Sequence, residues 1–312
     1  MRFVASEMPP LSAPTTDGRV HSVFRRVVNL RLADGDLLTL YAGDDDRQPP
    51  GAISFAPPAD FDFSEHVVPN AAISFRGGIL RIAGTGISID LRQARRNAAD
   101  TARPLSSGTT TEFNASWHLA WDTLIRAAGS AGLVIALHGR RPAGAFDAAL
   151  AARAQQAVPH LLDAARSNHI AAAMNAARQL AGAGPGLTPS GDDFLAGFLV
   201  GARHVAQTKT QFAFLDRLGQ ALSSPSHNSG DIAGAYLIHA AAGRAARPLR
   251  KLAFLVSQGG RASDIETATI TALHVGHSSG ADGTFGLLCG LAAWRPEFTA
   301  TITAGLTPGP KQ

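Results

Sequence analysis

Short apolar runs separated by polar or glycine-rich turns occupy the first hundred residues. Apolar and β-branched side chains recur in six such runs, at residues 23–32, 37–41, 52–55, 72–75, 79–82 and 87–91. The pairs Gly77-Gly78 and Gly84-Thr85-Gly86 separate the last three runs and supply the positive φ angles that tight hairpins require. Short strands at this spacing predict a small β-barrel or sandwich.

Helical periodicity replaces this pattern further along the chain. Between residues 113 and 128, Trp117, Trp121, Leu124 and Ala128 recur on one helical face. Further helices are predicted at residues 146–183, as two helices interrupted near Pro159, and at 193–206, 211–223, 231–246, 262–275 and 283–294.

A Ser-, Gly- and Thr-rich stretch with Pro104 lies between the two patterns and is typical of a linker. The sequence therefore predicts an α+β protein with a β-rich domain at residues 1–97, a linker at 98–112 and a mostly helical domain at 113–312.

Composition narrows the class of partner. The 312 residues carry a formal net charge of +4, and the Arg pairs are scattered rather than gathered in one stripe with aromatic residues. We therefore expect no nucleic-acid partner.

A single cysteine, Cys289, excludes an intramolecular disulfide. Residues 1–16 lack the apolar core of a signal peptide, and the most apolar window, residues 194–205, is too short to span a membrane. We expect a cytoplasmic protein without a membrane partner.

The strongest local motif runs from Gly182 to Asp193, with the sequence GAGPGLTPSGDD, and precedes an apolar helix. Its alternating glycines allow the backbone to approach a ligand, and Ser190 and Asp193 have the spacing of a capping box. Free N–H groups and the positive end of a helix together bind phosphate or carboxylate. A well-capped helix after a tight loop would explain the motif equally well. It is neither a Walker loop nor a dinucleotide-binding fingerprint.

Two further helix starts repeat the motif. Ser229-Gly230-Asp231 and Ser279-Gly280-Ala281-Asp282 each precede a predicted helix. The three helices also carry glycines four residues apart, which allow helices to pack closely: Gly197/Gly201, Gly230/Gly234 and Gly286/Gly290. We expect the starts at Ser190, Ser229 and Ser279 to face one cavity that binds a small anion.

His277 directly precedes the third start and is the histidine best placed to act as an acid or base. At least one of Asp192, Asp193 and Asp282 must cap a backbone N–H, pair with an Arg, or hold a cation or ligand N–H groups, because like charges in a poorly solvated site repel one another. We expect Asp193 to be the cap and Asp192 to face the ligand.

The motifs GPGLTPSGDD at residues 184–193 and GHSSGAD at residues 276–282 resemble those of the oxamate carbamoyltransferase subunit family of allantoin catabolism, a branch of purine degradation. The resemblance extends over most of the chain, but only these two motifs are specific. It implies phosphorolysis of oxalurate to oxamate and carbamoyl phosphate by a complex with two other subunits. This chain has Ser278 where the family usually has Thr, and the hydroxyl is kept.

The residues carried over by the resemblance are Gly184, Gly186, Leu187, Thr188, Pro189, Ser190, Gly191, Asp192 and Asp193, followed by Gly276, His277, Ser278, Ser279, Gly280 and Asp282. From their chemistry, backbone N–H groups at 186–192 and 278–280 would hold a phosphate or oxyanion. Asp192 or Asp193 would orient ureido nitrogens, and His277 would shuttle a proton. Ser229 and Gly230 complete the expected substrate site.

We thus expect an enzyme subunit acting on oxalurate, oxamate, carbamoyl phosphate and phosphate, with no cofactor and no dedicated metal site. Two alternatives remain. One is a Mg²⁺-assisted hydrolase of a ureido or nucleotide-like substrate, with Asp192, Asp193 and Asp282 at the metal. The other is a non-catalytic subunit whose ligand stabilises a complex.

Overall fold

The computed structural model of the chain describes residues 1–9, 17–43, 45, 48–96, 109–137, 141–223, 230–276 and 278–306. It divides into two compact units, Met1–Thr101 and Ala102–Gln312. Within the described residues, no helix is long and apolar enough to cross a membrane.

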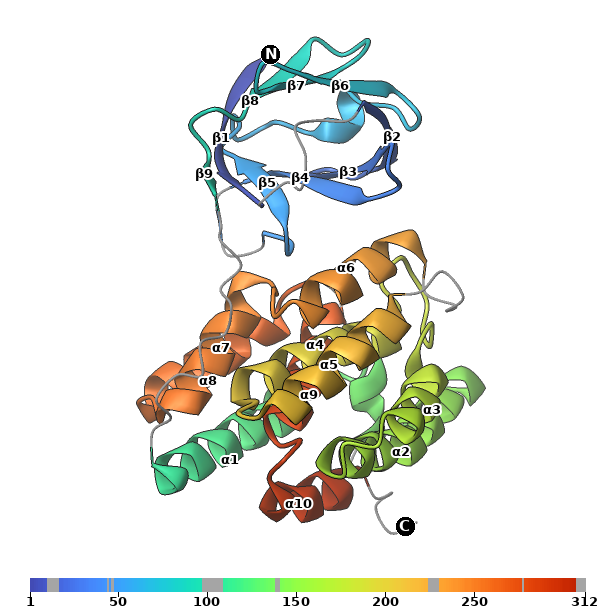
Figure 1. The fold of residues 1–312 in the computed structure, drawn as a ribbon, viewed down its shortest axis with the longest axis vertical. Coiled ribbons are helices and arrows are strands. Elements are labelled where there is room, and N and C mark those ends of the chain that lie inside the picture. Colours follow the sequence, from blue (N-terminus) through green and yellow to red (C-terminus); the bar gives the residue numbers. More distant parts are fainter. Residues whose placement is uncertain are drawn as a thin grey trace. The chain divides into compact units, whose positions relative to one another are not determined.

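The first unit is a closed eight-stranded barrel (Figure 1). The barrel strands are β1 (Arg2–Met8), β2 (Gly18–Val23), β3 (Val27–Leu32), β4 (Leu37–Ala42), β5 (Ala52–Phe55), β6 (Ala72–Arg76), β7 (Ile79–Ile82) and β8 (Ile87–Asp90). Their order is β5-β4-β3-β2-β6-β7-β8-β1, and β1 returns to pair with β5 and closes the barrel. A short strand β9 (Arg95–Arg96) pairs in parallel with the end of β1, and a 3₁₀ turn η1 (Phe63–Glu65) follows β5. The barrel prediction is confirmed.

Alternating apolar residues fill the barrel because successive side chains of a strand point to opposite faces. Val28 and Leu30 of β3 and Leu80 of β7 are fully buried in one core with Phe55 and Phe63. The six sequence runs all form strands, although residues 23–32 contain a turn at Arg25-Arg26 that separates β2 from β3. Strand β1 was not predicted.

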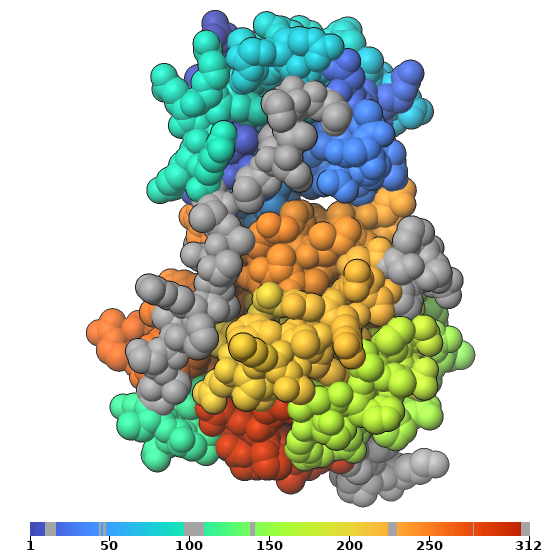
Figure 2. Space-filling model, in the orientation of Figure 1, coloured from blue at the N-terminus to red at the C-terminus, as the bar shows by residue number. Residues whose placement is uncertain are grey.

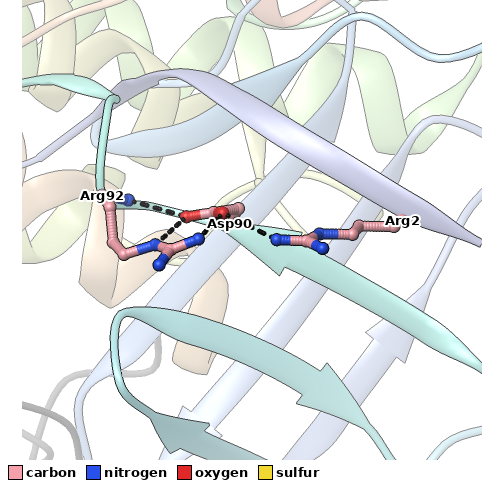
Figure 3. Close-up of polar contacts among 3 residues, drawn as sticks. All are labelled: Arg2, Asp90 and Arg92. Carbon is pink, nitrogen blue, oxygen red and sulfur yellow. Dashed lines mark hydrogen bonds and ion pairs between the residues drawn. The ribbon is translucent and has the colours of Figure 1, made fainter.

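Charged residues hold β1, the strand that closes the barrel, against β8. Asp90, at the end of β8, accepts from Arg2 of β1 at 3.2 Å and from Nε of Arg92 at 2.9 Å (Figure 3). Hydrogen bonding by Arg92 holds the pKa of Asp90 well below its usual range. Because β1 and β8 run parallel here, this cluster ties together two strands that are distant in sequence.

The second unit consists of helices (Figure 1). They are α1 (Thr110–Ala127), α2 (Ala145–Arg166), α3 (Ile170–Leu180), α4 (Ser190–Val205), α5 (Lys209–Leu222), α6 (Asp231–Ala241), α7 (Arg247–Gln258), α8 (Ala262–Leu273), α9 (Ser279–Leu291) and α10 (Pro296–Leu306), with a 3₁₀ turn η2 (Leu133–Ala136). The α+β class is confirmed.

Several predicted helix limits were wrong. The break in residues 146–183 occurs at residues 167–169 rather than near Pro159, which lies inside α2. The helix predicted at 231–246 ends at Ala241, and α7 and α10 were not predicted. The predicted face of α1 is confirmed, since Trp117, Trp121 and Leu124 are buried.

Helices α4 and α9 form the centre of this unit. Every residue of α9 after Ser279 is buried, while α5, α6, α10 and the α2–α3 pair lie at the surface on the face shown in Figure 2. A Cβ built at Gly197 would lie 2.0 Å from the carbonyl oxygen of Gly283, and one at Gly201 would lie 2.2 Å from that of Leu287. Later residues of α4 thus face later residues of α9, so the two helices run parallel with their N-termini at the same end.

The facing glycines of α9 make the same contacts in return. A Cβ at Gly286 would lie 1.9 Å from the carbonyl oxygen of Phe194, and one at Gly290 would lie 2.2 Å from that of Phe198. The expected close packing through glycines is confirmed for these two helices. It is wrong for α6, where Cβ atoms at Gly230 and Gly234 would meet nothing within 4 Å.

We predict opposite effects for two matched Gly→Ala substitutions within helices. Gly286→Ala forces the α4 and α9 backbones apart and should lower the free energy of unfolding by about 1–3 kcal/mol or more. Gly234→Ala has free space and should raise it by about 0.5–1 kcal/mol, because alanine restricts the unfolded chain and suits a helix. Urea denaturation followed by circular dichroism measures both. Equal stability of the Gly286→Ala protein and the wild type would contradict the backbone-to-backbone contact.

Candidate functional site

The glycine-rich motif folds as a tight loop that leads directly into α4. Gly182, Gly184 and Gly186 have φ angles of 70°, 118° and 97°, in the region that glycine tolerates best. The N–H of Gly191 donates to the carbonyl of Ala183 at 2.8 Å and closes the loop. Helix α4 begins at Ser190, as predicted.

The expected capping box is wrong. Pro189 is the N-cap residue, and no side chain caps this helix start. Ser190 lies inside the first turn, where it is 3% exposed. Asp193 therefore does not have the capping role that the spacing predicted.

The start of α9 lies beside that of α4. Helix α9 begins at Ser279 with Ser278 as its N-cap residue, and the N–H of Gly280 donates to the carbonyl of Val275 at 2.8 Å. The hydroxyls of Thr188 and Ser279 are 3.2 Å apart and share a hydrogen bond. The structure thus joins two of the three expected starts. Ser229 and His277 lie outside the described residues, so the place of the third start, where Gly230 precedes α6, stays a prediction.

The two helix starts exchange serine–aspartate interactions. Burial raises the pKa of Asp282 of α9 and of Asp193 of α4, and hydrogen bonding from the serine of the other helix, Ser190 for Asp282 and Ser279 for Asp193, offsets part of each rise. The carboxyls also raise one another's pKa, since the charge of Asp193 acts on Asp282 and that of Asp192 acts on Asp193. The site is therefore a compact group of carboxyls and hydroxyls at two positive helix ends.

Asp282 caps the turn η2. The side chain is fully buried, and its Oδ1 accepts the N–H groups of Leu133 at 2.6 Å and Val134 at 3.3 Å. Gly132 has a φ of 81°, and a Cβ there would lie 2.2 Å from Oδ2 of Asp282. Burial raises the pKa of Asp282 to about 8, so this carboxyl is largely protonated at neutral pH.

Asp192 holds the glycine loop. It is 2% exposed, and its Oδ1 accepts the N–H of Gly182 at 3.2 Å. We expected Asp193 to be the residue that caps a backbone N–H and Asp192 to face the ligand, but it is Asp192 that accepts a backbone N–H. The requirement that at least one of the three aspartates satisfies a backbone N–H is confirmed twice, by Asp192 and by Asp282.

The hydrogen-bond partners of Asp193 are side-chain hydroxyls. Its Oδ2 is buried and, like Oδ2 of Asp282, has no hydrogen-bond partner among the described residues. Burial raises the pKa of Asp193 to about 7, and hydrogen bonds from Ser279 and Thr188 offset part of the rise. Burial raises the pKa of the Tyr236 hydroxyl on α6 to about 12, and the charge of Asp193 contributes to this rise.

The backbone donors differ from those expected. The N–H groups of Asp192 and Asp193 both donate to the carbonyl of Pro189, and those of Gly191 and Gly280 are also satisfied internally. Within the expected ranges, the donors left for a ligand come from the loop before Pro189 and from the first residues of α9.

Among the described residues, no group of three or more His, Cys, Asp or Glu side chains is arranged to hold a metal ion. Sequence reasoning missed one feature of this part of the chain. A groove of about 480 Å³ lies elsewhere, between α2 and α3, lined among others by His160, Asp163 and His169.

Two family models match the chain, one in each of its two units. A model described as oxamate carbamoyltransferase subunit AllH matches residues 180–291, which include α4, α6 and α9. A model of the AllH family N-terminal domain matches residues 4–96, the barrel. No curated protein and no solved structure matches the chain.

The buried carboxyl of Asp282 predicts a pH-dependent stability. Between about pH 4 and pH 8 the unfolded state has released this proton while the folded state keeps it, so the free energy of unfolding falls as pH rises. Asp282→Asn keeps an acceptor oxygen but has no proton to lose. The difference between the free energies of unfolding of the wild type and of Asp282→Asn should change by up to about 1.4 kcal/mol per pH unit in this window. Parallel profiles would show that Asp282 has an ordinary pKa.

Proposed function

The chain belongs to the AllH family, and from this premise we propose that it is the subunit of an oxamate carbamoyltransferase that binds the small substrate at the paired N-termini of α4 and α9. The reaction is the reversible phosphorolysis of oxalurate, in which phosphate takes the carbamoyl group and oxamate leaves. In the reverse direction carbamoyl phosphate carbamoylates the oxamate nitrogen and releases phosphate.

The observation that carries this proposal is the direct pairing of two parallel helix starts through Thr188 and Ser279, within the segment that matches the family. Helix N-termini stabilise negative charge through their N–H groups and dipoles. The substrates on both sides of the reaction are small anions. A tight glycine loop beside two such ends suits a ligand that brings a phosphate or a carboxylate.

We assign the residues of this site as follows. The anionic end of the ligand meets the loop and the two helix starts, formed by Gly184, Gly186, Thr188, Ser190, Gly191, Ser278, Ser279 and Gly280 with Ser229 and Gly230 from the start of α6. Asp192 positions the loop through the N–H of Gly182, and Asp282 positions α9 through η2. His277 would carry the proton that the leaving nitrogen takes up.

This subunit would work in the cytoplasm with two other subunits in purine degradation, without nucleic acid or a membrane as partner. Carbamoyl transfer needs no redox cofactor, and the described carboxyls already have hydrogen-bonding roles in the fold.

The test is reconstitution of the complex and measurement of oxamate-dependent phosphate release from carbamoyl phosphate. We predict no activity when this chain is omitted. A chain with Thr188→Val and Ser279→Ala should lower kcat/KM by about 10–100-fold, because two hydroxyls at the anion site are lost. The control is Ser263→Ala, at an exposed position in the first turn of α8. Full activity without the chain would refute the proposal. Full activity of the double variant would place the site elsewhere.

A further inference from the structure

Helix α6 lies at the surface of the helical unit, but its sequence is that of a helix buried on all sides (Figure 2). Its 11 residues read DIAGAYLIHAA, and only Asp231, Tyr236 and His239 among them are polar. A helix that is apolar all round is normally covered all round. Helices α4 and α5 of the same chain cover one side of α6, where Ile232 and Leu237 are buried.

The opposite side of α6 is apolar and exposed. Gly234, Ala235 and Ile238 share this outer face, since residues three or four apart lie on the same side of a helix. Ile238 is 48% exposed, and a Cβ built at Gly234 would meet nothing within 4 Å. Beyond Asp231 in the first turn, no polar side chain accompanies them. The outer face of α6 therefore consists of a hollow at Gly234 beside a protrusion at Ile238, one helical turn apart.

Helices α4 and α9 show what paired glycines do in this chain. Both helices read Ser-x-x-Asp-x-x-x-Gly-x-x-x-Gly, from Ser190 and from Ser279. The Cβ position of each of their four paired glycines lies within 2.2 Å of a backbone oxygen of the other helix. The third pair, Gly230 and Gly234 of α6, has no atom within 4 Å. Small residues at this spacing let a second helix approach closely, and for α6 no described helix does so.

The shape of the outer face fits a second copy of itself. When two identical helices cross antiparallel around a two-fold axis, position i of one meets position j of the other, and j meets i. An axis midway between Gly234 and Ile238 places each Ile238 over the hollow at Gly234 of the other copy. A parallel crossing would instead set Ile238 against Ile238 and leave both hollows empty.

The charges at the two ends of α6 favour the same orientation. Asp231 begins the helix, and Arg244 follows its end after a turn at Gly243. The buried Nε of Arg244 has no hydrogen-bond partner among the described residues. An antiparallel crossing brings the end that carries Asp231 beside the end of the other copy that carries Arg244, and it also opposes the two helix dipoles.

We propose that two copies of this chain associate through the outer faces of their α6 helices, packed antiparallel with Ile238 of each copy over Gly234 of the other. This association goes beyond the proposed function, because it does not depend on which ligand the chain binds. Helix α6 is about 16 Å long. A contact of this length is smaller than the standard interface of about 800 Å² per partner, so the dimer forms reversibly at micromolar concentrations.

Sedimentation velocity on the purified full chain, from about 1 to 200 µM, measures this association. The average mass of the wild type should rise with concentration toward that of two chains. Ile238→Asp buries a charge in the apolar contact and should raise the dissociation constant by at least about 30-fold. The matched control is Ile270→Asp, the same change at an exposed isoleucine of α8, which should leave the constant within about 2-fold of the wild type.

A second variant separates association from folding. Gly234→Leu fills the hollow and should also raise the dissociation constant by at least about 30-fold. The leucine has free space in the single chain and suits a helix better than glycine does. Its melting temperature in dilute solution should therefore equal or exceed that of the wild type.

Cysteine cross-linking tests the orientation. Cys289 is buried, so cysteines introduced at positions 234 and 238 are the accessible ones. A mixture of Gly234→Cys and Ile238→Cys chains should form disulfides at least about 5-fold faster than either variant alone, because only unlike positions lie opposite each other. Faster reaction of each variant with itself would overturn the antiparallel packing.

The remaining outcomes decide whether a second copy is the partner. A wild type that stays a single chain at about 200 µM refutes the proposal. Association that survives both Ile238→Asp and Gly234→Leu refutes it as well. If the Ile238→Cys chain is shielded from a thiol reagent only in the reconstituted complex, another subunit covers the face, and the proposal is again refuted. None of these results changes the phosphate-release experiment, so the proposed function is tested separately.

Discussion

The backbone contact between α4 and α9 is the constraint on which the helical unit depends. Gly197 and Gly201 face the backbone of α9, and Gly286 and Gly290 face that of α4. Because the helices run parallel, their positive ends lie side by side, an arrangement that repels unless negative groups are near. Asp192, Asp193 and Asp282 all lie within the first turns. The same packing that makes the core compact therefore creates a place where carboxyls and anions are stabilised.

Two of the three carboxyls hold neighbouring backbone segments in place. Asp192 and Asp282 accept backbone N–H groups from the glycine loop and from η2, and both are buried. Asp193 occupies the position in α4 that Asp282 occupies in α9, and its hydrogen-bond partners are the hydroxyls of Ser279 and Thr188. The barrel has its own core and its own charge cluster at Asp90.

Local sequence patterns predicted those strands and helices in which regularly spaced apolar residues form one buried face. The barrel strands from residue 27 onward, the start of α4 and the glycine contacts all follow from spacing alone. Pro159 was misjudged because a proline can lie inside a long helix when packing supports it, and α2 buries Val158 and Leu161 around it. Helix α7 carries Pro248 in its first turn and several cationic residues. These residues interrupt the apolar pattern, so the helix was not recognised from the sequence.

The starts of α4 and α9 were predicted from the sequence, but the partners of their side chains were not, for a physical reason. The spacing of Ser190 and Asp193 suggests a local capping box, but both side chains interact with the other helix. Asp282 accepts N–H groups from η2, and the charge of Asp193 acts on Tyr236, across long sequence separations that no local pattern reports. A comparison of the two Ser-x-x-Asp-x-x-x-Gly segments with each other was the available signal.

The most direct test of the account is the position of oxamate in a crystal structure of the chain. We predict that its carboxylate lies beside Thr188 and Ser279, at the paired starts of α4 and α9. Oxamate bound in the α2–α3 groove at His160 and His169, with nothing bound at Thr188 and Ser279, would contradict this.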